Sequence, residues 1–264
     1  MSSIIKISPG QGRGETFEHM TRLAADWIYR FGYSSRDTIE NHLFPTAKTK
    51  GLARALFAKG WATEIPCFCG DSTKRETKQD QPKTVIVLTP LGVAQFREEY
   101  DTVWDYPEMA WTRCDLVRCD DLLYVQQATA NNLRIGSIDQ FWTPRMILGV
   151  GPDYPLPDAE WLTRTGERLS VDADTGCSYP WRHQLCLNLS IRMGTDYPIY
   201  NRAALLSTQY EIVEDYHERL KAGKKLPIWA DEPEDFVPLA EVAVPDLSRK
   251  MVVFLAESGR EIML

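Results

Sequence analysis

Four carboxylates lie close together in the segment 156–176, and their spacing could support metal chemistry. On either side of Gly166, apolar or neutral residues alternate with polar ones, which predicts two antiparallel strands closed by a turn at this glycine. The apolar positions must share one face if the hairpin is to pack on the rest of the protein. The opposite face then carries the four acids, Asp158, Glu160, Asp172 and Asp174.

The apolar positions also set an expected register. A turn with an odd number of residues, most simply Thr165–Glu167 with Gly166 in the left-handed conformation, places Trp161 across from Val171. This register pairs the acids across the hairpin, Asp158 with Asp174 and Glu160 with Asp172. Carboxylates about 5 Å apart on facing strands repel one another unless a cation or water lies between them. Mg²⁺ or Mn²⁺ suits such an all-oxygen site, and a hydrated acidic face without metal is the alternative.

Composition places few limits on function. The chain has 264 residues, of which 44% are hydrophobic, enough to bury a core. No apolar run approaches the ~20 residues that cross a bilayer, and no signal peptide is recognised, so we expect a cytoplasmic protein without a membrane segment. The six cysteines lack paired Cys-x-x-Cys zinc spacings.

Charge is distributed unevenly along the sequence. The net charge is −7, with +3 over residues 1–100 and −10 over residues 101–264. A basic front and an acidic back suggest different partners for the two parts.

The first hundred residues predict one small domain after a flexible leader at 1–14. Helical spacing of apolar residues, capping signals and prolines predict helices at 15–31, from Ser34 or Ser35 to 44, at 46–59 and at 90–100. Two strands, 61–68 and 84–88, enclose a basic loop. This order, with the phrases at 52–62 and 87–92, resembles a winged helix-turn-helix domain spanning 15–104. The resemblance implies binding of double-stranded DNA, with the third helix in the major groove and the loop on phosphates. The basic residues on these two elements are Lys48, Lys50, Arg54, Lys74, Arg75, Lys78 and Lys83.

A linker is predicted at 101–111, followed by a second domain at 112–264. Its expected order is a helix at 115–133, an irregular strand at 138–147, the acidic hairpin, and a helix or strand at 182–192. A helix at 205–222 and strands at 226–230 and 251–255 follow. The order resembles the PD-(D/E)XK nuclease core, and its union with a winged helix is similar to the replication-relaxation proteins and MobC-type plasmid relaxases. The expected fold class is therefore α+β, with a restriction-endonuclease-like α/β domain built on a mixed central sheet.

The motifs that carry this resemblance are Leu88–Gly92, Pro157–Trp161 and Asp172–Gly176. Asp158 would be the family's first metal ligand, Asp172 its second acid, and Asp174 would stand where the family usually has Lys, so these three are the catalytic and metal-binding candidates. An aspartate cannot supply the positive charge of that Lys, although relaxases of this group are described with an acid there. Further candidates for accessory roles are Asp120, Asp121, Glu160, Arg182, His183 and Gln184.

Two functions follow from the resemblance. One is metal-dependent, site- and strand-specific DNA nicking that initiates plasmid mobilisation or replication, using Mg²⁺ or Mn²⁺ to stabilise the phosphodiester transition state. Its partners would be an origin-of-transfer-like duplex and other mobilisation proteins. The other is a non-enzymatic DNA-binding regulator or relaxosome accessory protein whose nuclease domain has lost its chemistry.

Overall fold

A computed structural model of the chain describes the ranges 17–45, 50–67, 83–97, 119–147, 151, 154–176, 179–194, 199–229, 238–255 and 261–263. The chain divides into two compact units, Met1–Leu148 and Gly149–Leu264, and each mixes helices with strands. The expected α+β class is therefore confirmed. The predicted leader at 1–14 and linker at 101–111 lie outside the described residues.

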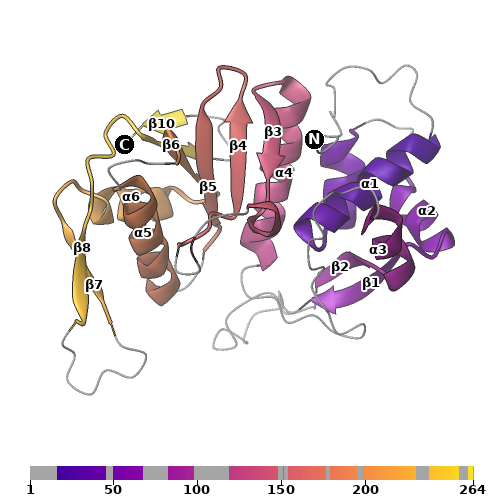
Figure 1. Cartoon of the computed structure of the whole chain (residues 1–264), viewed down its shortest axis with the longest axis horizontal. Helices are drawn as coiled ribbons and strands as arrows, with labels where there is room; N and C mark the ends of the chain where they lie inside the picture. The colour runs from indigo at the N-terminus through magenta and orange to yellow at the C-terminus, as the bar shows by residue number, and fades with distance from the viewer. Residues whose placement is uncertain are drawn as a thin grey trace. The chain divides into compact units, whose positions relative to one another are not determined.

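The first unit begins with helices and a two-stranded ribbon (Figure 1). Its elements are α1 (Phe17–Phe31), the π-helical turn η1 (Thr38–Leu43), α2 (Leu52–Ala58), β1 (Ala62–Cys67), β2 (Lys83–Leu88), α3 (Pro90–Arg97), α4 (Cys119–Ile135), β3 (Ile138–Trp142) and a 3₁₀ turn (Pro144–Met146). Each helix and strand predicted before residue 101 has a counterpart here, although the second is a π-helical turn. Prediction and structure thus agree on element order through α3.

Helix α1 lies at the centre of this unit because its apolar stripe packs on several neighbours. Trp27 and Ile28 are buried, and α1 contacts α2, α3 and β2. Strands β1 and β2 pair antiparallel, from Ala62 opposite Leu88 to Cys67 opposite Lys83. Residues 23–30 of α1 and 85–88 of β2 are buried at every position, so these two stretches form a small core.

Helix α3 begins as its sequence predicts. The Thr89 hydroxyl accepts a hydrogen bond from the Gly92 amide at 3.1 Å, and Pro90 is the first helical residue. Gly92 also permits a close approach, because a Cβ at this position would lie 2.0 Å from the carbonyl oxygen of Trp61. A larger residue at position 92 would separate α3 from the segment that leads into β1.

The start of α2 is held by a side chain from η1. The Glu40 carboxylate accepts hydrogen bonds from the amides of Gly51 at 3.0 Å and Ala53 at 3.2 Å. Amides in the first turn of a helix have no partner within the helix, so an acidic side chain there is favourable. Glu40 therefore ties the orientation of α2 to the turn that precedes it.

Helix α4 belongs to the first unit, whereas the predicted division placed it in the second. Gln126 of α4 accepts a hydrogen bond from the Trp27 indole at 3.0 Å and donates one to the Tyr33 carbonyl at 3.0 Å. Both bonds are buried and join segments more than ninety residues apart in sequence. The compact unit consequently extends past residue 104 to residue 148.

The second unit is built on a mixed sheet (Figure 1). Its elements are β4 (Ala159–Thr163), β5 (Arg168–Asp174), α5 (Tyr179–Met193), β6 (Arg202–Ser207), α6 (Tyr210–Arg219), β7 (Lys225–Ile228), β8 (Ala240–Ala243), β9 (Met251–Leu255) and β10 (Glu261–Met263). Within this unit the sheet order is β10-β9-β6-β5-β4. The pairs β5–β6 and β6–β9 are parallel, and β4–β5 and β9–β10 are antiparallel.

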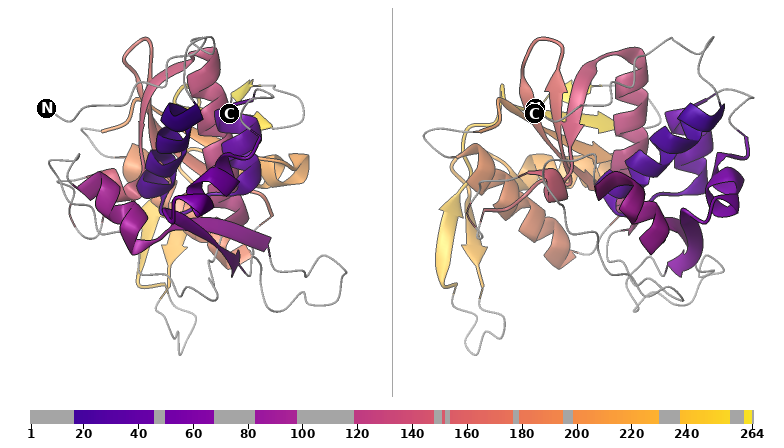
Figure 2. Two further views of the ribbon diagram at one scale, coloured as in Figure 1. Left: turned by 90° about the vertical axis from the view of Figure 1, so that its right-hand side faces the viewer. Right: turned by 45° about the vertical axis from the view of Figure 1, so that its right-hand side comes forward.

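The main core of this unit lies between β6 and helices α5 and α6. Ala203 and Leu205 of β6 pack in one cluster with Leu189 of α5 and with Ile212 and Tyr216 of α6. The antiparallel β7–β8 hairpin lies beside α5 (Figure 2). Helix α5 therefore has β6 and the β7–β8 hairpin as neighbours.

The predicted helix at 205–222 was wrong at its start. Residues 202–207 form β6, and α6 spans only Tyr210–Arg219. Strand β6 has parallel neighbours on both sides and the run Ala203–Leu206 is buried, so it lacks the alternation of a half-exposed strand. Of the two structures considered for 182–192, the helix is the one that forms.

Candidate functional site

The β4–β5 hairpin carries the predicted acids, but in a different register. Ala159 pairs with Val171 and Trp161 with Leu169, so the predicted pairing of Trp161 with Val171 was wrong by two residues. The turn closes with Thr163 and Glu167 joined by a backbone hydrogen bond, and Gly166 has φ of 84°. An odd-numbered turn with left-handed Gly166 is thus confirmed. A shift of two residues keeps every side chain on its face.

The acids therefore share one face, although their partners differ from those predicted. Glu160 lies opposite Ser170 rather than Asp172. Asp158 directly precedes β4, and its Oδ2 accepts a hydrogen bond from the Ala173 amide at 3.0 Å. This contact brings Asp158 to the stretch of β5 that carries Asp172 and Asp174. The three predicted metal ligands are all buried, at 8%, 2% and 0% exposure respectively.

Asp172 is paired with an arginine from helix α5. Nη2 of Arg192 donates a hydrogen bond to Oδ2 of Asp172, and the two side chains are 0% and 2% exposed. A buried carboxylate is costly unless a positive charge or several hydrogen-bond donors compensate it. Arg192 supplies that compensation from a position that sequence reasoning did not select.

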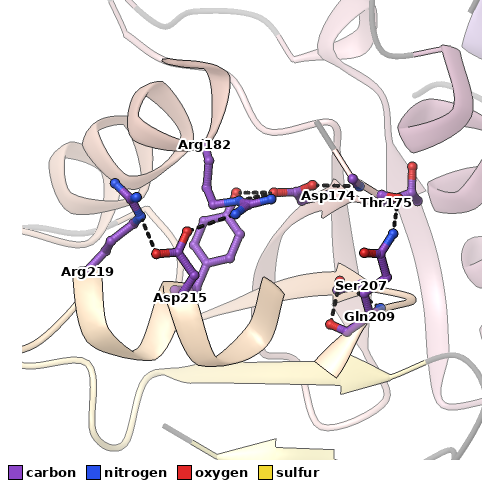
Figure 3. A network of polar contacts seen from close by, with 9 residues as sticks. Asp174, Thr175, Arg182, Ser207, Gln209, Asp215 and Arg219 are labelled. Carbon is purple, nitrogen blue, oxygen red and sulfur yellow. Dashed lines mark hydrogen bonds and ion pairs between the residues drawn. The ribbon is translucent and has the colours of Figure 1, made fainter. Parts of the chain in front are cut away.

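Asp174 lies at the centre of a larger network (Figure 3). Its Oδ2 accepts hydrogen bonds from Arg182 Nε and from the Tyr216 hydroxyl, each at 2.9 Å. Its Oδ1 accepts one from the Gly176 amide at 2.9 Å. Asp174 thus uses both oxygens on donors from α5, α6 and the turn that follows β5.

The network continues from Arg182 across helix α6. Arg182 Nη1 donates to Asp215 at 2.9 Å, and Arg219 Nε donates to the same carboxylate at 2.9 Å. Burial lowers the pKa of Arg182, but the hydrogen bonds to Asp215 and Asp174 raise it by more. Burial raises the pKa of Asp215, and the hydrogen bonds from Arg219 and Arg182 lower it by more. Both ends of this pair are therefore held in their charged forms.

Glu160 is also paired. Its Oε1 accepts a hydrogen bond from Arg168 Nε at 2.7 Å, and Glu160 is completely buried while the Arg168 side chain is 45% exposed. All four acids of the hairpin thus accept hydrogen bonds from the protein, and for three of the acids a donor is an arginine. Among the described residues, no group of three His, Cys, Asp or Glu side chains has an arrangement that could hold a metal ion.

The sequence contains a signal for Arg192, which was not among the candidates, and for Arg182, which was. On α5, Arg182, Leu185, Leu189 and Arg192 follow at helical spacing, so the two arginines lie on the stripe that packs inward. A charged residue at an inward position requires a partner of opposite charge. Tyr216 has no comparable signal, because a tyrosine on an apolar stripe is ordinary.

The predicted accessory residues lie in different surroundings. The ring of His183 bonds through Nε2 to the Pro227 carbonyl at 2.8 Å, and Gln184 donates to Asn188 on the same helix at 2.9 Å. Asp120 and Asp121 are in the first turn of α4 and belong to the first unit. Glu160 lies on the acidic face itself, and Arg182 reaches that face through its bond to Asp174.

The structure describes only part of the predicted DNA-binding set. Arg54 on α2 and Lys50 just before this helix are exposed. For Lys83 only the backbone at the start of β2 is described. The remaining four lie outside the described residues: Lys48, Lys74, Arg75 and Lys78.

Comparison with protein-family models, with curated proteins and with solved structures gives no match for this chain. Within the described ranges, no helix combines the length and apolar character needed to span a membrane.

Proposed function

We propose that the chain binds double-stranded DNA through α2 and the β1–β2 ribbon, as a regulator or accessory protein of plasmid mobilisation. The observation that carries the proposal is the exposure of two cations, Arg54 on α2 and Lys50 just before this helix. Leu52, Ala53 and Leu56 are buried, so one face anchors the helix and leaves Arg54 exposed. In winged helix domains, the helix before the ribbon enters the major groove.

Electrostatics favour the same region. Residues 1–100 carry the positive excess of the sequence, whereas residues 101–264 are strongly negative. Lys and Arg side chains supply most non-specific affinity for DNA by neutralising phosphates and releasing counterions. The front of the chain is therefore where a duplex would be attracted.

The proposal is tested by titrating a labelled duplex with the full-length protein in fluorescence anisotropy. Replacing Lys50 or Arg54 by Ala should weaken binding and reduce the slope of log K against log salt by about 1 for each phosphate that is no longer neutralised. Arg134→Ala is the matched control, because Arg134 is exposed on α4 and its replacement removes the same charge. Equal binding by the wild type and the Lys50→Ala, Arg54→Ala double variant would exclude α2 as the DNA-binding element.

Metal-dependent nicking is the second candidate, and one observation favours it. Asp158 bonds to β5 between Asp172 and Asp174, and the hairpin is followed by α5 and the parallel strand β6, an order that resembles the PD-(D/E)XK core. As arranged, however, the carboxylates do not fit Mg²⁺ or Mn²⁺. A cation would have to displace Arg192 from Asp172 and Arg182 from Asp174.

The two candidates are separated by incubating the protein with supercoiled plasmid and Mg²⁺ or Mn²⁺. Open circles that disappear with EDTA and in Asp158→Asn, but persist in the hairpin control Glu167→Gln, would establish the enzyme. DNA binding without open circles would leave the regulator. An origin-of-transfer region and other mobilisation proteins are the natural additions to either assay.

A further inference from the structure

Several buried polar atoms on and near the acidic face of the β4–β5 hairpin lack hydrogen-bond partners within the described part of the chain. Glu160, Ser170 and Arg192 are 0% exposed and Tyr200 is 1% exposed. The atoms without partners are Glu160 Oε2, Ser170 Oγ, Arg192 Nε and Nη1, and the hydroxyls of Tyr200 and Tyr154. Folded proteins rarely leave so many buried polar atoms without a partner in one region.

The positions of these groups place them in one neighbourhood. Glu160 and Ser170 face each other across β4 and β5. Asp172 is the next residue on the same face of β5, and it accepts the hydrogen bond from Arg192. Arg192 therefore reaches this face from α5.

The two tyrosines lie close enough to feel the same charges. Burial raises the pKa of Tyr200, the charge of Glu160 raises it further, and Arg192 lowers it. The pKa of Tyr154 is raised by burial, lowered by Arg192 and raised by Glu160. Tyr200 also belongs to the buried cluster that contains Leu189 and Met193 of α5, and Tyr154 packs against that cluster. Both phenols therefore lie in the neighbourhood of Arg192 and Glu160.

The hydrogen-bonding character of these atoms specifies a complementary ligand. Arg192 can only donate, the three hydroxyls can donate, and Glu160 Oε2 as a carboxylate oxygen can only accept. A complementary ligand has several acceptor oxygens and one donor. The four charged side chains here form two ion pairs, Arg168 with Glu160 and Arg192 with Asp172, so their charges balance.

We propose that the cluster of Glu160, Ser170, Arg192, Tyr154 and Tyr200 binds a phosphate group that retains one proton. The phosphate P–OH donates to Glu160 Oε2, and its other oxygens accept from Arg192 and the hydroxyls. Tyr154 and Arg168 are only partly buried, so the cluster approaches solvent on their side. The proposal is independent of DNA binding by the first unit.

The test uses isothermal titration of the full-length protein with inorganic phosphate and with sulfate near neutral pH. Sulfate has the same shape but no proton, so Glu160 should exclude it and its affinity should be weaker by more than about tenfold. Glu160→Gln replaces the acceptor by an amide that can donate, and it should reverse this preference. Ser170→Ala and Tyr200→Phe each remove one donor and should weaken phosphate binding several-fold.

Controls make the result decisive. Tyr210→Phe makes the same chemical change on an exposed tyrosine of α6 and should leave phosphate binding unchanged. A nucleoside monophosphate, titrated in parallel, distinguishes a phosphomonoester ligand from free phosphate. The proposal is overturned if no phosphate binding is detected, or if phosphate and sulfate bind equally and neither Ser170→Ala nor Tyr200→Phe changes the affinity.

Discussion

Two sets of charged side chains, one in each unit, lie in opposite environments. In the first unit, Lys50 just before α2 and Arg54 on α2 are exposed, while buried apolar residues of α2 hold the helix in place. In the second unit, Asp172 and Arg192 are both buried and bonded to each other. Exposed cations contribute little to stability and can contact a polyanion, whereas buried pairs depend on each other. The environment, more than residue type, decides which charged residues are free to bind.

The comparison predicts its largest effect at Arg192. Arg192→Ala should lower the free energy of unfolding by about 3–5 kcal/mol, because it leaves the carboxylate of Asp172 buried without its cation. Urea denaturation followed by circular dichroism measures the change. The exposed Arg134→Ala should stay within about 0.5 kcal/mol of the wild type. A loss of under about 1 kcal/mol in Arg192→Ala would show that the pair is not the support that its burial suggests.

A smaller loss is expected at Tyr216. Tyr216→Phe removes one hydrogen bond to the charged Asp174 while the bond from Arg182 remains. Hydrogen bonds to charged groups contribute about 1.5–3 kcal/mol, so a loss in this range is expected from the same denaturation experiment. The exposed Tyr210→Phe provides the reference, and equal stability of the two variants would contradict the role assigned to the network.

The network also predicts a dependence of stability on pH. The folded-state pKa of Asp215 lies below its ordinary value of 3.8, so its contribution is present above pH 4 and lost as the pH falls through the folded pKa. The stability advantage of the wild type over Asp215→Asn should therefore shrink below about pH 4. The effect is modest because Asp215 is 30% exposed and solvent screens the pair. A constant difference between the two proteins from about pH 7 to about pH 3 would contradict this linkage.

The smallest effect on stability is expected at α2. Lys50→Ala and Arg54→Ala should each change the free energy of unfolding by less than about 0.5 kcal/mol, because both side chains are exposed. Thermal denaturation of each variant beside the wild type checks this expectation. A larger loss would mean that these cations stabilise the fold, and it would weaken their assignment to DNA.

Local signals predicted much of the secondary structure. The apolar spacing of α1, the Thr89-Pro90 start of α3 and the left-handed Gly166 turn each depend on nearby residues, and each is found in the structure. Strand β6 was missed because a buried parallel strand and a buried helix can share the same apolar composition. The hairpin register was missed because a shift of two residues leaves both faces unchanged.

The candidate site was predictable only in part. Alternation placed Asp158, Glu160, Asp172 and Asp174 on one face, and the structure agrees. The arginine partners of Asp172 and Asp174 depend on how α5 crosses the sheet, a long-range relation that strand periodicity does not contain. The alternation of apolar and polar residues therefore located the acids, whereas tertiary packing determines which of their oxygens accept hydrogen bonds from the protein.

The carboxylate of Glu40 has a consequence for how α2 could meet a duplex. Its bonds to the amides of Gly51 and Ala53 occupy donors that many helices offer to a phosphate oxygen. A backbone phosphate approaching that end would also meet the negative charge of Glu40. Contacts to the DNA backbone would then come from the flexible side chains of Lys50 and Arg54. The length of these side chains, rather than the end of the helix, would determine the position of α2 in the groove.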